Sequence, residues 1–213
     1  YIDKLKNMGI SISRKNILTS GQAAGAYLSE KKKGARVFVL GTSLLKAELV
    51  TYGLEIAETP ACDIDYVVAG FDTELTYQKL RDACSILECQ DVGFVATNPD
   101  LVCPVAKKRF IPDCGSICTI IENATGRVPV FIGKPNTTMI ELVKSRFQIN
   151  SEKIAVIGDR LYTDIALGVN AGIMSICVLS GEATIEEISR SSVKPDLVVS
   201  SIGDLIPQII TCS

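Results

Sequence analysis

Residues 154–164 have the sequence IAVIGDRLYTD, in which a short apolar run gives way to a polar loop. The run at 154–157 is typical of a buried strand in a parallel sheet, and Asp159 follows it closely. Asp164 lies five residues further on, at the expected start of a helix, where it is suited to cap. Ligands of open α/β sheets bind at the carboxyl ends of strands, so both carboxylates are placed to contact one. Such a pair suits Mg²⁺, which usually takes one or two carboxylates together with phosphate and water.

A lysine occupies a second strand end, in the segment VFIGKPN at 130–136. Gly133 permits a close backbone approach to Lys134, and Pro135 helps to fix the turn before the next helix. A lysine held there supplies a point positive charge suited to a phosphoryl group. A Walker phosphate-binding loop is excluded, because Gly126 lies too far away and Pro135 stands where Ser or Thr is needed.

Both strand ends also have a simpler explanation. A solvated lysine in a turn is compatible with Lys134. A turn followed by a helix N-cap accounts for Asp164. It does not account for Asp159, because a carboxylate that ends a buried strand needs a partner.

A third polar turn follows the apolar run at 92–96. Asn98-Pro99-Asp100 is a turn by its chemistry, and Cys103 comes shortly after it. The turn is placed to present Asn98, Asp100 and Cys103 to a ligand, although the local pattern alone favours an ordinary turn.

Apolar runs and helix-length segments alternate along the whole chain. The expected strands are 36–40, 66–71, 92–96, 128–132, 154–157, 174–179 and 197–199, and the expected helices include 44–52, 74–87, 138–147, 164–170 and 185–189. Continuous apolar strands that alternate with helices predict an α/β fold, with a doubly wound parallel sheet covered on both faces.

The chain opens on a helical pattern. Ile2, Leu5 and Met8 keep helical spacing, and Gly9 ends the segment. A βαβ unit begins with its strand, so we expect that an N-terminal portion of this domain is absent. Turn-like stretches at 19–21 and 123–127 flank a middle region with three expected strands, which predicts a second domain there.

Composition excludes several classes of function. The chain has no histidine, which removes Ser-His-Asp and Cys-His hydrolases and histidine-ligated metals. The net charge of −2 gives no reason to expect nucleic acid as a partner. No apolar run approaches the roughly 18–20 uncharged residues of a membrane span. The eight cysteines fit reduced cytoplasmic thiols better than a disulfide scaffold, and their closest pairs, Cys84/Cys89 and Cys114/Cys118, are wider than the CxxC pairs of zinc sites.

The motifs together resemble the haloacid dehalogenase superfamily, in its NagD-like, p-nitrophenylphosphatase branch. The matching stretches are LTSGQA at 18–23, VAGFD at 68–72, LTY at 75–77, ATNPD at 96–100, PDCGSI at 112–117, GKP at 133–135 and GDRLYTD at 158–164. The resemblance implies an aspartate nucleophile that attacks a phosphomonoester, and a second aspartate that acts as acid and base. Lys134 matches the lysine that neutralises charge, Asp159 the metal ligand, and Asp164 its supporting acidic residue.

The chain departs from this family pattern at its N-terminus. In the family, the nucleophile and the acid/base aspartate precede the helix that opens this chain, and no strand followed by Asp-x-Asp-Gly occurs here. Asp72 follows an expected strand, but it matches a stretch of the family's cap and is not taken as the nucleophile. Cys103 falls near where some relatives place a substrate-contacting histidine, which leaves open any preference for vitamin phosphates or nucleotides.

The resemblance also implies a domain plan and a function. We expect residues 1–20 and 129–213 to form the catalytic core and 21–128 to form an inserted α/β cap, through which relatives often dimerise. The expected function is Mg²⁺-dependent hydrolysis of small phosphomonoesters, such as sugar phosphates or phosphoglycolate, in the cytoplasm. Asn98, Asp100, Cys103 and Lys134 are the expected substrate contacts.

Two alternatives have no catalytic turnover. One is a binding module with a degenerate phosphatase fold. The other is a receiver domain of a signalling relay, which the order of the motifs disfavours, because the lysine of a receiver comes last and Lys134 precedes Asp159.

Overall fold

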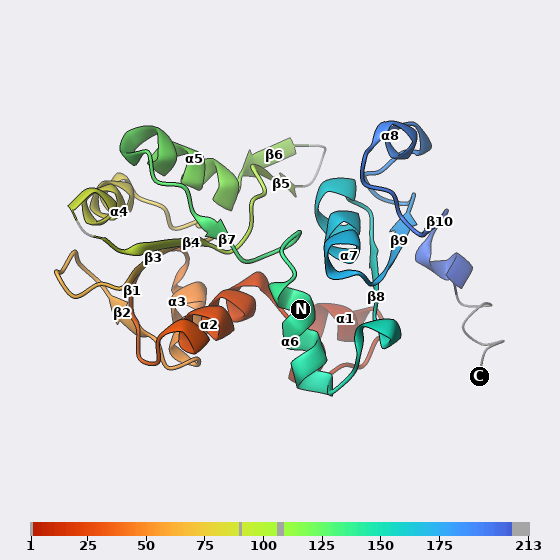
Figure 1. Cartoon of the computed structure of the whole chain (residues 1–213), viewed down its shortest axis with the longest axis horizontal. Coiled ribbons are helices and arrows are strands. Elements are labelled where there is room, and N and C mark those ends of the chain that lie inside the picture. The colour runs from red at the N-terminus through yellow and green to blue at the C-terminus, as the bar shows by residue number, and fades with distance from the viewer. Residues whose placement is uncertain (1, 90, 106–108, 206–213) are drawn as a thin grey trace. The chain divides into compact units, whose positions relative to one another are not determined.

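The computed structural model describes residues 2–89, 91–105 and 109–205. The chain divides into two compact units, Tyr1–Val130 and Phe131–Ser213, and each is described by itself (Figure 1). The assignment of 1–20 and 129–213 to a core and of 21–128 to a cap remains a prediction.

The first unit is built on a five-stranded sheet. Its strands, in spatial order, are β2 (Glu55–Ala57), β1 (Arg36–Leu40), β3 (Tyr66–Ala69), β4 (Gly93–Ala96) and β7 (Val130–Phe131). The pairs β1–β2, β1–β3 and β3–β4 are parallel. In the register, Val39 lies beside Val68 and Val68 beside Val95, so the buried middle residues of three strands form one apolar row.

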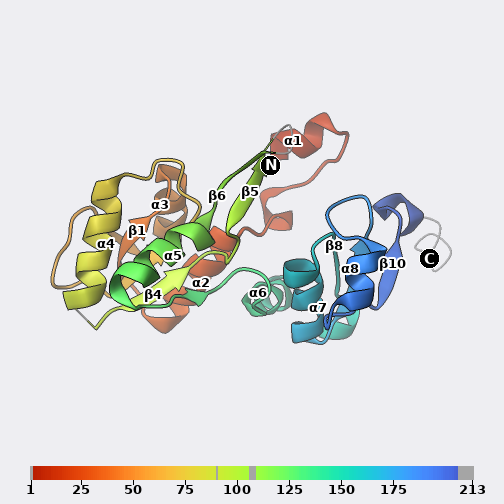
Figure 2. The same ribbon diagram turned by 90° about the horizontal axis from the view of Figure 1, so that it is seen from above.

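Helices cover both faces of this sheet, as predicted for a doubly wound fold. Helices α2 (Ser20–Lys31) and α3 (Ser43–Val50) pack together on one face, and α4 (Tyr77–Cys89) and α5 (Cys114–Thr125) on the other (Figure 2). The two faces bury side chains such as Leu28 and Leu87 completely or nearly so.

Two stretches that were expected to be turns are helix ends. Thr19 caps α2, because its hydroxyl accepts from Gln22 N and its own N–H donates to Gln22 Oε1. Helix α5 continues to Thr125 and ends at Gly126, whose φ of 70° is left-handed. Cap residues share their chemistry with turn residues, so the sequence pattern did not separate the two.

Three short strands of the first unit were not predicted. They are β2 and the antiparallel hairpin of β5 (Val102–Val105) and β6 (Arg109–Pro112). The hairpin is mostly exposed and contains Pro104 and Pro112, so it lacks the apolar run that marks a buried strand. The opening helix was predicted and is found as α1 (Ile2–Asn7), with the 3₁₀ turn η1 (Arg14–Asn16) after it.

The second unit has a three-stranded parallel sheet. The order is β10 (Leu197–Val199), β9 (Met174–Val178), β8 (Ala155–Gly158). Its helices are α6 (Thr138–Phe147), α7 (Ala166–Ala171) and α8 (Ile185–Arg190), and η2 (Ser151–Lys153) and η4 (Ile202–Leu205) are 3₁₀ turns. Ile140 of α6, Leu167 of α7 and Ile173 form one cluster of the core, with Val156 of β8 packed on it.

A second cluster of this unit forms around Cys177. It joins Ile165 and Ala183 to that thiol, with Ile188 of α8 packed against them. The core therefore fixes β8 and β9 beside each other and brings both of their carboxyl ends to one edge. No helix of the described residues is long and apolar enough to cross a membrane.

Candidate functional site

The loop after β8 folds back on itself through a π-helical turn. The turn, η3, spans Leu161–Ile165, so the helix starts before Asp164 and not at it as expected. Asp164 Oδ2 accepts from the backbone N–H of Arg160 at 3.3 Å. A Cβ on Gly158 would stand 2.3 Å from Cβ of Asp164, so only glycine fits at this end of the strand. The turn thus returns the Asp164 carboxylate to the end of β8.

Lys134 and Asp164 meet directly. Lys134 Nζ lies 2.7 Å from Asp164 Oδ1, and the side chains are 44% and 11% exposed. The Lys134–Pro135 peptide bond is cis. Pro135 O accepts from Asn170 Nδ2 at 3.0 Å, which ties the lysine loop to α7. The lysine therefore keeps an exposed charged head next to a mostly buried carboxylate.

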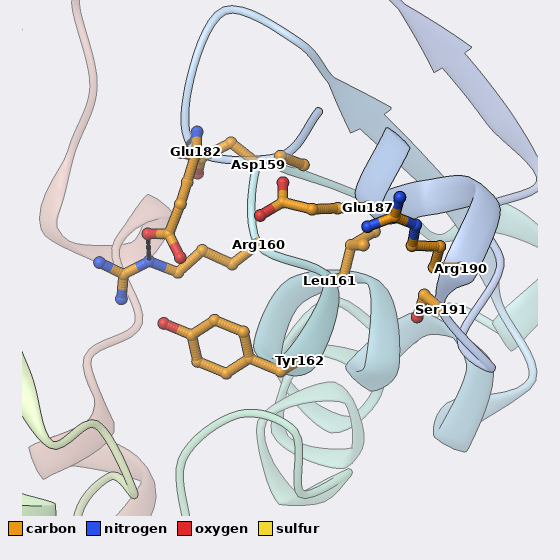
Figure 3. Close-up of a pocket in the computed structure, with 9 residues that line it drawn as sticks. Asp159, Arg160, Leu161, Tyr162, Glu182, Glu187, Arg190 and Ser191 are labelled. Carbon is orange, nitrogen blue, oxygen red and sulfur yellow. Dashed lines mark hydrogen bonds and ion pairs between the residues drawn. The ribbon is translucent and has the colours of Figure 1, made fainter. Parts of the chain in front are cut away.

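Asp159 is held by a segment of another loop, the one between β9 and α8. Its Oδ2 accepts from Glu182 N at 2.9 Å, and its backbone carbonyl accepts from Ala183 N at 2.9 Å. Glu182 in turn accepts from Arg160 Nε at 2.8 Å (Figure 3). Within the described part of the chain, Asp159 Oδ1 has no hydrogen-bond partner, so this oxygen is open to a ligand.

A hollow of about 380 Å³ opens beside Asp159 (Figure 3). Its lining residues come from η3 and from the β9–α8 region, and they are Asp159, Arg160, Leu161, Tyr162, Glu182, Ala183, Glu187, Arg190 and Ser191. Tyr162 is 56% exposed, and its ring lies 6.0 Å from the Arg160 guanidinium carbon. The hollow is open, and charged side chains such as Arg160 and Glu187 share its lining with apolar surface, which suits a small-molecule ligand.

Two buried groups lie close to the carboxylates. Thr163 is 2% exposed, and its hydroxyl has no hydrogen-bond partner among the described residues. Burial raises the pKa of the Cys177 thiol, and the charges of Asp159 and Asp164 raise it further. Cys177 is therefore a neutral thiol beneath the site and not a nucleophile.

The donor set fits a hard divalent cation with few protein ligands. The described residues contain no group of three or more His, Cys, Asp or Glu that could hold a metal. Mg²⁺ does not need one, because it is usually bound by one or two carboxylates and completes its shell with water and phosphate oxygens. Asp159 Oδ1 is an oxygen of that kind. Lys134 is not among the described residues that line the hollow beside it.

The three predicted residues of the other strand end lie in the first unit. Asn98 Oδ1 accepts from Asp100 N at 3.0 Å, which is the turn that the sequence favoured. Cys103 lies on β5, opposite Ile111. Their roles as substrate contacts remain predictions.

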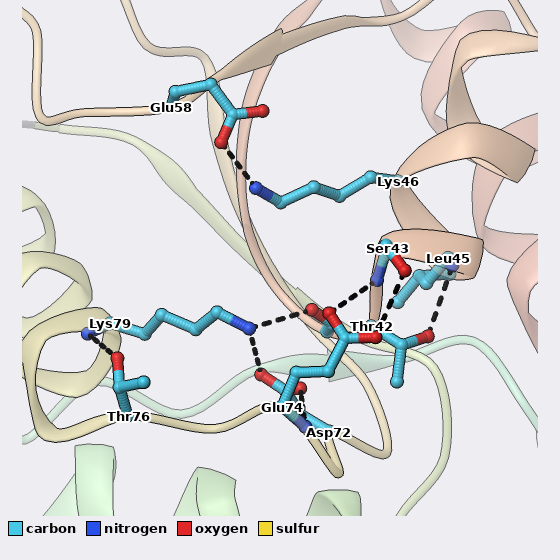
Figure 4. Close-up of polar contacts among 10 residues, drawn as sticks. Thr42, Ser43, Leu45, Lys46, Glu58, Asp72, Glu74, Thr76 and Lys79 are labelled. Atoms are coloured by element: carbon cyan, nitrogen blue, oxygen red, sulfur yellow. Dashed lines mark hydrogen bonds and ion pairs between the residues drawn. The ribbon is translucent and has the colours of Figure 1, made fainter.

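Asp72 has a structural function. Its side chain is fully buried, and its Oδ2 lies 2.9 Å from Lys79 Nζ (Figure 4). Lys79 also donates to Gly41 O at 3.1 Å, so the pair joins the loops that follow β1 and β3. Because both oxygens of Asp72 are engaged, the second of them by Glu74 N, this carboxylate is not available as a nucleophile.

The sequence-based prediction missed Gly181, Glu182 and Arg160. The same strand-end rule applies to Gly181 and Glu182, since they follow the apolar run at 174–179 almost directly. These residues contact Asp159 through their backbone, and the identity of a residue in the sequence does not predict a backbone contact.

The chain matches two family models. Residues 131–205 match a model described as HAD-hydrolase-like, and residues 1–55 match one described as haloacid dehalogenase-like hydrolase. An acid sugar phosphatase of Staphylococcus haemolyticus is 33% identical over 206 residues, which are 97% of this chain and 77% of that protein.

Several solved structures with this fold are described as phosphatases. A 4-nitrophenylphosphatase from Thermotoga maritima superposes with a TM-score of 0.90 at 42% identity, over 97% of this chain and 78% of that one. NagD from E. coli K-12 superposes with a TM-score of 0.85 at 28% identity, over 95% of this chain and 78% of that one. A glycerol phosphate phosphatase from Mycobacterium tuberculosis in complex with magnesium superposes with a TM-score of 0.89 at 26% identity, over 96% of this chain and 62% of that one.

Proposed function

The chain belongs to the haloacid dehalogenase-like hydrolases, in the NagD-like, p-nitrophenylphosphatase branch, and we propose that this phosphatase is a Mg²⁺-dependent hydrolase of small phosphomonoesters. The proposed substrates are sugar phosphates or phosphoglycolate-like compounds. The names of the relatives, acid sugar phosphatase and glycerol phosphate phosphatase, support a small phosphorylated metabolite.

The contact between Lys134 and Asp164 carries the proposal. A lysine head 2.7 Å from a carboxylate at a strand end is a fixed positive charge, and it needs no rearrangement to meet a phosphoryl group. Phosphoryl transfer depends mostly on positioning and charge neutralisation, so this is the contribution expected of the residue. Asp164 holds the lysine in place.

Asp159 is the residue proposed to hold Mg²⁺, with Asp164 in support. Its Oδ1 faces no protein donor among the described residues, while Oδ2 is fixed by Glu182 N. A bound Mg²⁺ supplies positive charge to the phosphoryl oxygens.

The proposed covalent chemistry is that of the family. An aspartate attacks phosphorus, the alkoxide leaves with a proton from a second aspartate, and water then hydrolyses the aspartyl phosphate. Neither aspartate is identified among the 213 residues, so both are proposed to come from outside them. In support, β8 is an edge strand of the described sheet, and Ile157 on it is 40% exposed. An open edge beside Asp159 suits one more parallel strand.

The first unit is proposed to act as the cap. Asn98, Asp100 and Cys103 would contact the leaving group from it, and its exposed hairpin would join two copies into a homodimer. We further propose a cytoplasmic protein, on the grounds that a chain with eight cysteines in no disulfide-scaffold pattern suits a reducing compartment.

The test begins with the coding sequence upstream of Tyr1 and an assay of the protein that includes it. We expect an Asp-x-Asp pair after an apolar strand and Mg²⁺-dependent hydrolysis of p-nitrophenyl phosphate. Lys134→Ala and Asp159→Asn should each lower kcat by on the order of a hundredfold or more, because each removes one preorganised charge.

Two controls match those variants. Lys144→Ala removes a lysine whose ion pair is with the exposed Glu141, and Asp204→Asn changes a carboxylate that caps η4. Both should keep wild-type kcat. Activity that survives Lys134→Ala and Asp159→Asn contradicts the site, and an upstream sequence without the Asp-x-Asp pair favours a non-catalytic binding module with a degenerate phosphatase fold.

A further inference from the structure

We propose that the segment Gly181–Glu182–Ala183 is a positioning loop for Asp159, which decides which oxygen of that carboxylate faces the metal and the substrate. The inference rests on the proposed function and adds residues that the family pattern of Lys134, Asp159 and Asp164 does not include. It is carried by contacts of the loop with both the backbone and the side chain of Asp159.

Two neighbouring N–H groups of the loop hold Asp159 at two points. Glu182 N donates to the carboxylate oxygen Oδ2, and Ala183 N donates to the backbone carbonyl, each at 2.9 Å. A carboxylate held at one oxygen and at its own main chain has little freedom to rotate. Oδ2 is thereby committed to the protein, and Oδ1 is presented outward.

Gly181 makes this approach possible. A Cβ at that position would lie 2.0 Å from Asp159 Oδ2 and 2.4 Å from both Cβ and Cγ of Asp159. These distances are far below any contact between real atoms, and Asp159 has a short side chain with few other rotamers. Alanine at 181 therefore forces either the loop or the carboxylate to move.

An ion pair connects the loop to the end of β8. Glu182 Oε2 accepts from Arg160 Nε at 2.8 Å, and Arg160 is the residue directly after Asp159 (Figure 3). The loop is thus fixed by the backbone and the side chain of the same residue, Glu182. Groups that orient a metal ligand in this way typically change metal affinity or activity by 10–100-fold, roughly, when they are lost.

The first measurement needs neither metal nor substrate. Amide hydrogen exchange is followed in the full-length wild-type protein and in Asp159→Ala. Glu182 N–H loses its acceptor in the variant, so its exchange should rise about tenfold or more while the amides of β9 stay protected. Unchanged protection at Glu182 overturns the proposal.

The second measurement is binding of Mn²⁺, as a probe for the Mg²⁺ site, by electron paramagnetic resonance without substrate. Gly181→Ala should weaken binding by about tenfold or more, and Glu182→Gln by a smaller factor in the same direction. Gly203→Ala is the matched glycine control, because among the described residues a Cβ there meets Ser201 Oγ at 3.4 Å, which is ordinary contact distance. Glu141→Gln is the matched ion-pair control, because Glu141 pairs with Lys144 on α6 at 3.1 Å and neither residue lines the hollow beside Asp159.

The outcomes separate this proposal from the proposed function. Wild-type affinity in Gly181→Ala, with a wild-type melting temperature, overturns the positioning loop and leaves the phosphatase assignment intact. A wild-type protein that binds no Mn²⁺ overturns the proposed metal dependence, and hydrogen exchange at Glu182 then decides the loop by itself.

Discussion

At the scale of single residues, the site contains a buried polar group without a hydrogen-bond partner among the described residues, next to the charged Asp164. The Thr163 hydroxyl is buried in the π-helical turn, one residue before Asp164, and has no partner among the described residues. A buried hydroxyl without a hydrogen bond costs about 1–3 kcal/mol. Backbone and polar features that reduce stability are often kept at functional sites. The π-helical turn and its unpaired hydroxyl therefore indicate a functional site and not a requirement of folding.

Thr163→Val should stabilise the protein by about 1 kcal/mol, because valine keeps the branched shape and removes the unpaired hydroxyl. Urea unfolding at neutral pH measures the change. Thr97→Val is the control, since Thr97 is also buried but its hydroxyl donates to Cys114 Sγ at 3.9 Å, and it should not be stabilised. A loss of stability in Thr163→Val means that the hydroxyl has a partner in solution.

The buried ion pair of the first unit gives a second prediction. Lys79→Met leaves the fully buried Asp72 carboxylate without its counter-charge, and should destabilise the protein by about 3 kcal/mol. Lys46→Met is a close control, because Lys46 is 25% exposed, as against 22% for Lys79, but its partner Glu58 is 71% exposed (Figure 4). The control should cost less than about 1 kcal/mol. Equal losses in the two variants contradict the assignment of Asp72 as a structural carboxylate.

At the scale of elements, the start of β10 is tied to the start of β9 by one carboxylate. Asp196 Oδ2 accepts from Ser175 N at 2.7 Å and from Ser175 Oγ at 2.9 Å. These hydrogen bonds, the backbone one first, lower the pKa of Asp196 below its ordinary value. The charged form is therefore favoured in the folded protein, and its contribution depends on pH.

Asp196→Asn should make the protein less sensitive to acid. A carboxyl group with a lowered pKa in the folded state stabilises the protein above its unfolded pKa of about 3.9, and that stability is lost as the pH falls through the folded pKa. The variant should therefore be less stable than the wild type at pH 7, and the difference should shrink below about pH 4. Urea midpoints across this range measure it, and a constant difference contradicts the role of Asp196.

The helices and strands that the sequence predicted are those with a clear hydrophobic pattern, and the ones that it missed lack such a pattern. The strands at 36–40 and 197–199 and the helix at 138–147 were predicted with the bounds that the structure gives, because each carries its apolar residues in a single run or at helical spacing. The exposed hairpin β5–β6 was missed for lack of such a run. The site follows the same division. Asp159 and Lys134 were predicted as site residues from their place after a strand, and their roles remain predictions. The contact between Lys134 and Asp164 depends on the π-helical turn, which no local sequence pattern indicated.

At the scale of the whole molecule, exposed apolar side chains are spread over both units, and one hairpin of the first unit carries several of them. Four of them lie on the β5–β6 hairpin, with exposed fractions of 46% for Val102, 36% for Val105, 62% for Phe110 and 37% for Ile111. Among the described residues the hairpin forms a two-stranded sheet, so its outer edges offer backbone N–H and C=O groups to a further strand. Apolar side chains on an open edge are the usual mark of an association site.

The proposed homodimer is therefore expected to depend on Phe110. Phe110→Glu places a charge on the apolar hairpin without disturbing a core, so the chain should fold normally and lose its partner. Sedimentation equilibrium should give twice the mass of the single chain for the wild type and the single mass for the variant. Tyr77→Glu is the matched control, because Tyr77 lies on α4 of the same unit and is 82% exposed, and it should remain dimeric. A wild-type protein that sediments as a monomer contradicts the homodimer, and a dimer that survives Phe110→Glu locates its interface away from the hairpin.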